Sequence, residues 1–536
     1  MRSAASHARV TLSLAGLLAG AAVAADTEWG AYNHTLSGER FSELLEINTH
    51  NATGLRVACR YDTGQKLSFQ SGLVMAEGRL YGTTQSDTFA LDPATCRELW
   101  RVHEEYKSAS PLKVNRGVAY LEGRLFRGTQ DGRVLAYRAA SGERLWQTRI
   151  GNPQKGETVP AAPMAWNGRV FVGNAGGDLK GNKGRMYALD AATGKVLWEQ
   201  YLVPRDTGEA AQKDWQNPPD VPVTGGATWT TYTLDAARGT LYVPTGNAAP
   251  DFEQRLRPGA DRYTGSVVAL DAASGALQTV YPITPGDFHD WDVSSAPALI
   301  TTQGKRQLLI DAPKDGRLHA FDLGGKQLYA TPVSRIENDA QPFAEKPVHF
   351  CPGTQGGSEW NGPAFNPQQN LVFTGSIEWC TTVKLAPLEL TRKIPDGGPW
   401  TGNDVANPKK IYGTQDPTEQ WAGWVYAVDA DSGAVRWKYR TPYPVMSGIT
   451  ATAGGVVFAG DMGGTLYAFE SGTGQLLWSQ DLGGALGGGI ITYKAGGAQR
   501  LAVAVGMTSP IWPTQETTGQ VVVLAVEQPH IAQRTP

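Results

Sequence analysis

The segment "YALDAATGKVLW" at residues 187–198 decides the fold, because variants of this phrase occur seven times along the chain. Each copy combines a strand, an Asp-x-x-[Ser/Thr]-Gly type of turn whose glycine accepts positive φ, and a second strand that usually ends in Trp or Tyr. Each copy therefore predicts a β-hairpin. The copies cover residues 89–100, 135–146, 187–198, 268–279, 319–329, 426–437 and 467–478.

A further strand precedes several hairpins, as in "GRLYGTT" (78–84) and "GRVFVGN" (168–174), so each unit becomes a small antiparallel sheet. Such a sheet cannot bury itself, and radial packing closes the sheets into a propeller with Trp side chains between the blades. An eighth blade can form where "GLRVACRYDTG" (54–64) pairs with "GQVVVLAVE" (519–527). We predict an all-β fold, an eight-bladed β-propeller whose N- and C-terminal strands close the last blade.

The composition supports this architecture and argues against some classes of binding partner. The 64 Gly, 33 Pro, 16 Trp and 19 Tyr residues are typical of many short strands joined by tight turns. The formal net charge is −3 and the Lys and Arg residues are scattered, so we expect no nucleic acid and no anionic membrane surface as a partner. The irregular segment 385–410 predicts a loop excursion over one face of the propeller.

The N-terminus has the features of a secretory signal peptide. Arg2 and Arg9 are followed by an apolar run from Val10 and by the small residues "AVAA" (22–25). We therefore expect a signal peptide at residues 1–25, a single propeller domain at 26–536 and no membrane span. In an oxidising compartment the four cysteines suggest two disulfides. No C-x-x-C-H motif occurs, so we expect no covalently bound haem c on this chain.

A second stretch, "TPGDFHDWDVSSAP" (284–297), concentrates charge. Asp287, His289, Asp290 and Asp292 lie within six positions, and in an extended segment Asp290 and Asp292 point to the same side. Two carboxylates aimed together repel each other unless a cation lies between them. The stretch therefore requires a metal ion, a protonated partner or bulk water, and these alternatives stay open on the residues alone.

Taken together, these motifs resemble the quinoprotein alcohol dehydrogenases, eight-bladed propellers that hold pyrroloquinoline quinone (PQQ) and a metal ion. In "VNRGVAY" (114–120), Arg116 matches the arginine that binds the cofactor carboxylate, and a guanidinium suits that planar group. In "VGNAGGDLKGNKG" (172–184), Asp178 stands where the family has a metal-binding glutamate. The resemblance implies that the cofactor contacts Gln70, Arg116, Ala175, Gly176, Gly177, Trp229, Lys314 and Trp512, and that the metal ligands are Asp178, Asn247, Asp290 and Asp292.

The resemblance also implies a catalytic base in the stretch 284–297. With Pro297 kept in register the base is Asp290, which we favour, whereas a register anchored on "WD" would make it Asp292. An aspartate at the position of Asp292 occurs in family members that use lanthanides, and His289 stands where the family usually has Trp. The metal implied is Ca²⁺, with a lanthanide as the alternative.

The resemblance also bears on the cysteines, and it fails at several other positions. Cys351 and Cys380 match a family disulfide, and whether Cys59 and Cys96 pair stays open. Other positions depart from the family pattern: Ser110 and Pro111 replace a vicinal cysteine pair, Pro160 a threonine, Glu359 an asparagine and Met446 a tryptophan.

The implied function is that of a periplasmic dehydrogenase. It would oxidise a small or polymeric alcohol and pass electrons to a separate periplasmic c-type cytochrome. Two alternatives remain at this point. One is a non-enzymatic scaffold similar to the PQQ-like propeller of outer-membrane-protein assembly, and the other is a metal-dependent hydrolase on the same fold.

Overall fold

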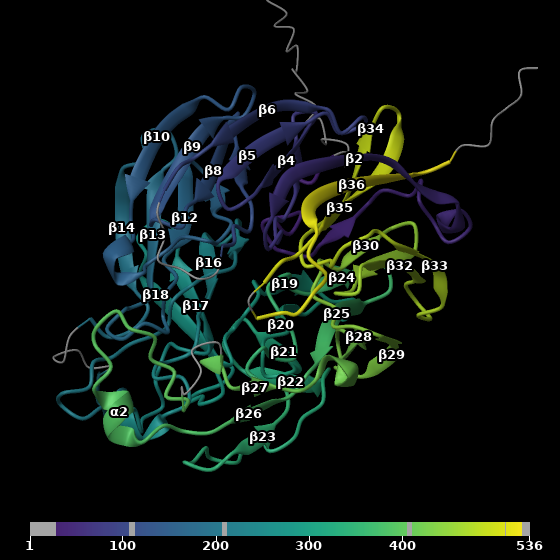
Figure 1. Cartoon of the computed structure of the whole chain (residues 1–536). Helices are drawn as coiled ribbons and strands as arrows, with labels where there is room; N and C mark the ends of the chain where they lie inside the picture. Colours follow the sequence, from purple (N-terminus) through teal and green to yellow (C-terminus); the bar gives the residue numbers. More distant parts are fainter. Residues whose placement is uncertain (1–27, 107–112, 206–211, 405–409, 510, 528–536) are drawn as a thin grey trace, which may run out of the picture.

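The computed structural model describes residues 28–106, 113–205, 212–404, 410–509 and 511–527. The predicted signal peptide, Ser110 and Pro111 lie outside the described residues. Within them, eight main sheets form a ring of blades (Figure 1). This arrangement confirms the predicted eight-bladed propeller.

The first five blades are four-stranded antiparallel meanders in chain order. Blade one is β3 (Val74–Ala76), β4 (Arg79–Thr83), β5 (Asp87–Leu91) and β6 (Glu98–His103). Blade two is β7 (Ala119–Leu121), β8 (Arg124–Gly128), β9 (Arg133–Arg138) and β10 (Arg144–Arg149). Blade three is β11 (Met164–Trp166), β12 (Arg169–Gly173), β13 (Arg185–Asp190) and β14 (Val196–Tyr201). Blade four is β15 (Thr233–Asp235), β16 (Thr240–Pro244), β17 (Ser266–Asp271) and β18 (Leu277–Pro282). Blade five is β19 (Ala298–Thr301), β20 (Gln307–Asp311), β21 (Arg317–Asp322) and β22 (Gln327–Pro332).

The last three blades include insertions or terminal strands. Blade six is β24 (Ala364–Asn366), β25 (Leu371–Glu378), β28 (Ala422–Asp429) and β29 (Val435–Thr441). Blade seven is β30 (Thr450–Thr452), β31 (Val456–Gly460), β32 (Thr465–Glu470) and β33 (Leu476–Asp481), with β1 (Phe41–Ser42) parallel to β30. Blade eight is β34 (Ile490–Ala495), β35 (Ala498–Val505), β36 (Thr518–Val526) and β2 (Leu55–Lys66).

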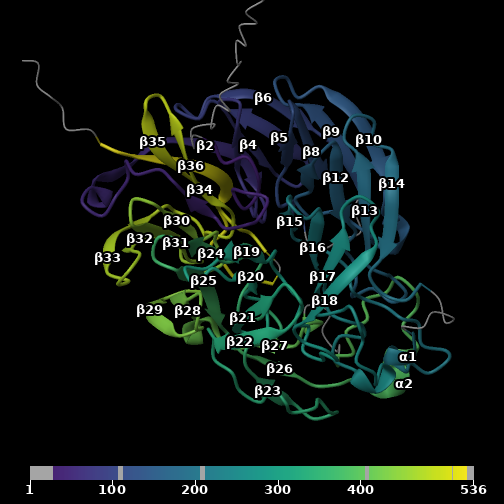
Figure 2. The same ribbon diagram turned by 180° about the vertical axis from the view of Figure 1, so that it is seen from behind.

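Burial shows which strand of each blade faces the middle of the ring. First strands such as β3 and β24 are buried along their whole length, whereas fourth strands such as β6 and β33 expose alternate residues. In both views β19 and β24 lie near the centre and β10, β14 and β33 lie at the rim (Figures 1 and 2). Segments that enter the first strands therefore converge near the centre.

Apolar clusters between blades hold the ring together. In the described residues, each blade shares such a cluster with the next, and blade eight shares one with blade one. Because these clusters join every blade to the next and blade eight to blade one, the ring is closed. Burial of these apolar side chains supplies the main driving force for the fold.

The repeated Trp and Gly residues contact each other across blade boundaries. Trp146, in β10, donates its indole N–H to the carbonyl of Ala191 in blade three at 3.1 Å. A Cβ atom at Gly194, in the same turn as Ala191, would lie 2.5 Å from the Trp146 ring. The predicted position of Trp between blades is confirmed. Equivalent contacts join Trp100 with Ala139 and Gly142, and Trp198 with Ala272 and Gly275.

The two ends of the chain close the ring in blade eight. Strand β2 pairs antiparallel with β36, with Leu55 opposite Val526, as predicted. A disulfide between Cys59 in β2 and Cys96 in the turn before β6 joins blade eight to blade one. This pairing answers the question that the sequence left open.

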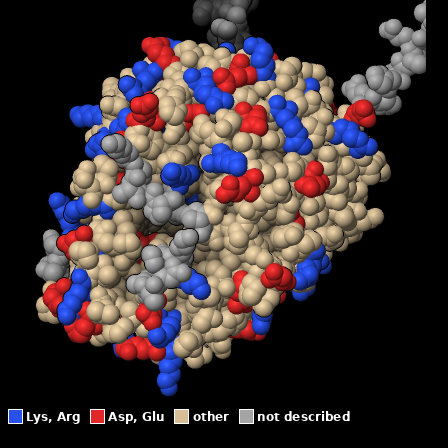
Figure 3. Space-filling view, in the orientation of Figure 1, with Lys and Arg blue, Asp and Glu red and all other residues tan. Residues whose placement is uncertain are grey.

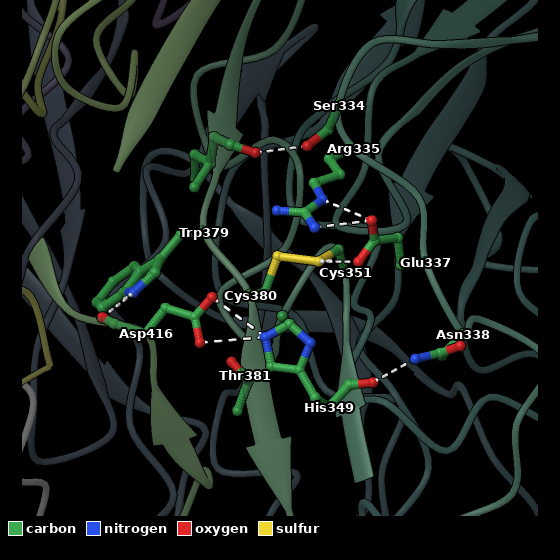
Figure 4. Close-up of a disulfide and its surroundings, with 12 residues drawn as sticks. Ser334, Arg335, Glu337, Asn338, His349, Cys351, Trp379, Cys380, Thr381 and Asp416 are labelled. Atoms are coloured by element: carbon green, nitrogen blue, oxygen red, sulfur yellow. Dashed lines mark hydrogen bonds and ion pairs between the residues drawn. A yellow bond between two sulfur atoms is a disulfide. The ribbon is translucent and has the colours of Figure 1, made fainter. Parts of the chain in front are cut away.

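A second disulfide lies in an insertion outside the main sheets. Cys351 and Cys380 form the predicted bond beside a small sheet of β23 (Val348–Phe350), β26 (Thr381–Val383) and β27 (Thr414–Gln415) (Figure 4). His349 Nε2 lies 3.1 Å from the Asp416 carboxylate in the same insertion. Since both cysteine sulfurs are bonded to each other, these cysteines are not free to ligate a metal.

The predicted excursion at 385–410 contains α2 (Leu388–Arg392), and its residues 405–409 lie outside the described part of the chain. The other short helices are α1 (Gln212–Trp215) and the 3₁₀ turns η1 (Ala52–Gly54), η2 (Pro153–Lys155), η3 (Gln254–Leu256) and η5 (Thr418–Gln420). None of the described helices has the length and apolar character needed to cross a bilayer. On the face shown in Figure 3, Lys and Arg side chains are interspersed with Asp and Glu.

Candidate active site

The segments that enter the first strands of several blades surround one cavity of about 990 Å³. Gln70 precedes β3, Arg116 precedes β7, Trp229 precedes β15 and Asp290 precedes β19. These segments come together because each first strand is the innermost strand of its blade. All twelve predicted cofactor and metal residues line this cavity: Gln70, Arg116, Ala175, Gly176, Gly177, Asp178, Trp229, Asn247, Asp290, Asp292, Lys314 and Trp512.

Three carboxylates from blades three, four and five meet beside the cavity. Asp178, Asp251 and Asp290 each offer one oxygen atom, and these atoms lie within 4.8 Å of one another. Asn247 connects the cluster to Asp292, since its backbone N–H donates to Asp292 Oδ1 and its side-chain N–H to Asp251 Oδ1, both at 3.0 Å. The donor set is therefore rich in hard oxygen atoms, which suits a hard cation such as Ca²⁺ or a lanthanide.

Lys314 lies between two carboxylates of the stretch 284–297. Its Nζ atom lies 2.7 Å from Asp292 Oδ2 and 3.5 Å from Asp290 Oδ2. Burial alone would lower the pKa of Lys314, but the two carboxylates outweigh it and hold that pKa well above its usual value. Asp290 and Asp292 are thus brought together as predicted, with a protonated lysine between them.

The carboxyl groups of the cluster are strongly perturbed. Burial raises the pKa of Asp290 well above its usual value, and Lys314 opposes this shift. Burial and the neighbouring Asp178 likewise raise the pKa of Asp251. For Asp178, burial and Asp292 raise the pKa to about 6. A cation bound among these groups would favour their ionised forms, so the arrangement fits a metal ion.

Asp290 is also held in an uncommon backbone conformation. Its φ of 68° lies in the left-handed region, which is uncommon outside glycine but which Asp adopts more readily than most residues. Its backbone carbonyl accepts a hydrogen bond from Lys314 Nζ at 3.2 Å. Such strained conformations concentrate at functional sites because the surrounding structure holds them.

Asp287 and His289 have a structural role beside the site. Asp287 accepts hydrogen bonds from the backbone N–H groups of His289 and Trp291, so it stabilises the local backbone of this stretch. Although burial raises it, the pKa of Asp287 is lowered overall by the hydrogen bond and charge of His289. The His289 ring stacks on Trp291 at 3.9 Å and packs near Phe350, so it replaces the family's aromatic residue inside an aromatic cluster.

The predicted cofactor residues build a polar and aromatic wall. The Arg116 guanidinium lies 4.6 Å from the centre of the Trp229 ring and donates to the Trp229 carbonyl at 2.9 Å. Trp512 contacts Trp379, with ring centres 4.7 Å apart. Lys314 Nζ lies 5.7 Å from the Trp229 ring. Cationic groups and a flat aromatic surface are thus presented together.

Five residues that line the cavity have a buried polar atom with no hydrogen-bond partner among the described residues. These atoms are Gln70 Oε1, Arg116 Nε, Gln130 Oε1, Glu359 Oε2 and Thr508 Oγ1. Burial raises the pKa of Glu359 to about 8, while Lys314 and Arg116 oppose the shift. Orphaned polar atoms beside aromatic rings in a roomy cavity fit a planar, polar cofactor such as PQQ.

Sequence reasoning missed two members of the site. Asp251 follows Asn247 by four residues in "NAAPDF", and this short spacing was the signal that could have found it. Tyr412, at the end of the excursion, donates its hydroxyl to Asp178 Oδ2 at 3.0 Å. No local pattern indicates that contact, because the two residues lie 234 positions apart.

Comparison with known families and curated relatives places the chain. A family model described as "Glucose/ethanol/alcohol dehydrogenase, beta-propeller domain" matches residues 29–336, more than half of the chain. A second model, described as "Outer membrane protein assembly factor BamB", matches residues 422–525. The quinohemoprotein alcohol dehydrogenase of Comamonas testosteroni is 29% identical over 89% of this chain and 72% of its own length. The lanthanide-dependent methanol dehydrogenase of Methylacidiphilum fumariolicum (strain SolV) is 27% identical over 87% of this chain and 82% of its own length.

Solved structures agree with this placement. The quinohemoprotein alcohol dehydrogenase structure from Comamonas testosteroni superposes with a TM-score of 0.83 and 26% identity over 94% of this chain and 81% of that chain. A europium-containing methanol dehydrogenase gives a TM-score of 0.82 and 25% identity over 93% of this chain and 98% of that chain. BamB from Moraxella catarrhalis, at 14% identity and a TM-score of 0.50, shares only the fold. The chain belongs to the PQQ-dependent alcohol dehydrogenase family of β-propellers.

Proposed function

We propose that this protein oxidises an alcohol and uses Asp290 as the general base. The observation that carries the proposal is the position of Asp290, which lines the cavity beside Lys314 and belongs to the three-carboxylate cluster. A base must be ionised at working pH, and burial opposes that state. Lys314 and a bound cation would both favour it.

The cofactor would be held by Arg116, Trp229, Gln70 and Lys314, and Trp512 would add an aromatic contact. Arg116 can bind a carboxylate through its planar fork, and Trp229 offers a flat surface to a conjugated ring system. The backbone of residues 175–177 borders the same cavity. When bound, PQQ supplies the acceptor for the two electrons of the alcohol, and the metal ion supplies a Lewis acid.

The metal would be held by Asp178, Asn247 and Asp290, with Asp292 as the fourth ligand of the predicted set. Ca²⁺ and lanthanides both accept such oxygen donors, and two similar proteins are a lanthanide-dependent and a europium-containing methanol dehydrogenase. Tyr412 holds Asp178 by its hydrogen bond, and Asn247 orients Asp292 through its backbone N–H. These contacts fix the ligands before an ion binds.

Substrate, electron acceptor and location complete the proposal. We infer a small or polymeric alcohol as substrate and a separate periplasmic c-type cytochrome as the acceptor of electrons. A similar protein, 27% identical, bears the name lupanine 17-hydroxylase [cytochrome c], which supports this class of acceptor. The predicted signal peptide supports export to the periplasm.

The test is reconstitution of the purified protein with PQQ and either Ca²⁺ or La³⁺. We expect alcohol-dependent reduction of an artificial dye, and no cofactor binding with either metal would refute the proposal. Asp290→Asn should lower kcat by about 10²–10⁴-fold, the usual contribution of a general base. Asp461→Asn is the matched control, because Asp461 is equally buried in the turn between β31 and β32 and does not line the cavity. If Asp292→Asn abolished turnover while Asp290→Asn retained it, the base would be Asp292.

A further inference from the structure

Asp251 is a buried carboxylate that the proposed ligand set does not use. Its side chain is fully buried, and Asn247 donates to its Oδ1 atom at 3.0 Å. Its Oδ2 atom is also buried and has no hydrogen-bond partner among the described residues. Burying a carboxylate without a partner is costly unless a cation or another charge-compensating group lies beside it.

The nearby cationic side chains are committed elsewhere. Arg257 forms an ion pair with Asp261 and donates to the backbone carbonyls of Pro250 and Asp251, so it does not bind the Asp251 carboxylate. Lys314 pairs with Asp290 and Asp292. In the described part of the chain, no ion pair therefore compensates the Asp251 carboxylate.

The position of Asp251 points to a metal ion as the missing partner. One of its oxygen atoms lies within 4.8 Å of oxygen atoms of Asp178 and Asp290. Hard cations such as Ca²⁺ take about six to eight oxygen ligands. A carboxylate on the next blade with an open oxygen therefore adds a ligand to those of Asp178 and Asp290.

Resting on the proposed function, we propose that Asp251 is an additional ligand of the metal site and makes this site prefer trivalent over divalent cations. The charge count supports the preference. Asp178, Asp251 and Asp290 together carry three negative charges when ionised, and Lys314 compensates Asp292 at 2.7 Å. A trivalent ion balances this set, whereas Ca²⁺ leaves one buried negative charge uncompensated.

The test measures binding of the metal alone to the full chain by isothermal titration calorimetry, with La³⁺ and Ca²⁺ in parallel. Asp251→Asn removes one charge and still accepts the hydrogen bond from Asn247. We expect it to weaken La³⁺ binding by at least about 100-fold and Ca²⁺ binding by at least about 10-fold, because replacing even an outer partner of a metal ligand costs about 10–100-fold in affinity. Asp251→Glu, which keeps the charge, should retain the preference for La³⁺.

Controls separate a ligand role from a structural one. Asp461→Asn should bind both ions as the wild type does, because Asp461 lies outside the cluster and accepts hydrogen bonds from Gly463 and Tyr467. Near-UV circular dichroism of the metal-free variants confirms that each is folded. Unchanged La³⁺ and Ca²⁺ affinities in Asp251→Asn would overturn the assignment of Asp251 and leave the proposed function intact. A wild type that binds neither ion would overturn this inference, whereas the proposed function is refuted only by the failed reconstitution with PQQ and metal.

Discussion

Replacing Gly194 by Ala isolates the contribution of the contact between blades. Gly194 has φ of 73°, and a Cβ atom there would lie 2.5 Å from the Trp146 ring. Gly168, in another turn of blade three, has nearly the same φ of 72° but no atom within 4 Å of its Cβ position. Gly168→Ala therefore measures the backbone cost alone, about 1 kcal/mol. Gly194→Ala adds overpacking of about 1–3 kcal/mol, for a total of about 2–4 kcal/mol.

The assay is equilibrium urea unfolding of both variants, followed by tryptophan fluorescence and far-UV circular dichroism. In a Trp146→Leu background the clash with the ring is relieved and only the Thr148 hydroxyl, 2.8 Å from the Cβ position, still crowds it. The cost of Gly194→Ala should therefore fall toward that of Gly168→Ala, and the decrease is the interaction energy of Gly194→Ala with Trp146. Equal destabilisation by the two glycine substitutions in the wild-type background would refute the idea that blades are held by Trp rings packed on turn glycines.

Three further outcomes are expected. Arg116→Lys, which loses the planar fork over Trp229, should weaken PQQ binding at least about 10-fold in a fluorescence titration, and unchanged affinity would exclude a bidentate contact. Cys59→Ser should lower the free energy of unfolding by about 3 kcal/mol in urea titrations without a reductant, with the reduced wild type as the comparison. Burial raises the pKa of Glu359 from its usual 4.5 to about 8, so the folded protein holds a proton that the unfolded chain has released. The stability of the cofactor-free protein should therefore fall as pH rises through that window, by up to about 1.4 kcal/mol per pH unit from this group, and Glu359→Gln should flatten the curve of thermal midpoint against pH.

The propeller could be predicted because its information is local and repeated. The phrase at 187–198 contains a whole hairpin, and seven copies require a ring of such units. That Gly194 supports Trp146 of the preceding blade could not be predicted, since the phrase itself pairs this glycine with its own Trp198. Only the packing of neighbouring blades shows that each turn glycine contacts the Trp of the preceding blade.

The residues of the candidate site also fall into those that could be predicted from the sequence and those that could not. Residues within recognisable motifs, such as Arg116 and Asp290, were predicted because each motif occupies one short segment. Tyr412 reaches Asp178 from a long excursion, and no periodicity encodes the path of that segment. His289 remained unexplained from the sequence because its cluster combines the neighbouring Trp291 with Phe343 and Phe350, which come from a distant insertion.

The disulfide between Cys59 and Cys96 has a consequence for the order of assembly. Both cysteines lie near the N-terminus, so the bond can form as soon as blade one has reached the oxidising compartment, and it does not require β36. Strand β2 is then anchored on blade one and presents a free edge. The C-terminal strand β36, which is the last strand in the chain, can then pair with this edge of β2. Because Trp512 lies between β35 and β36, the step that completes the circle also completes the wall of the cavity.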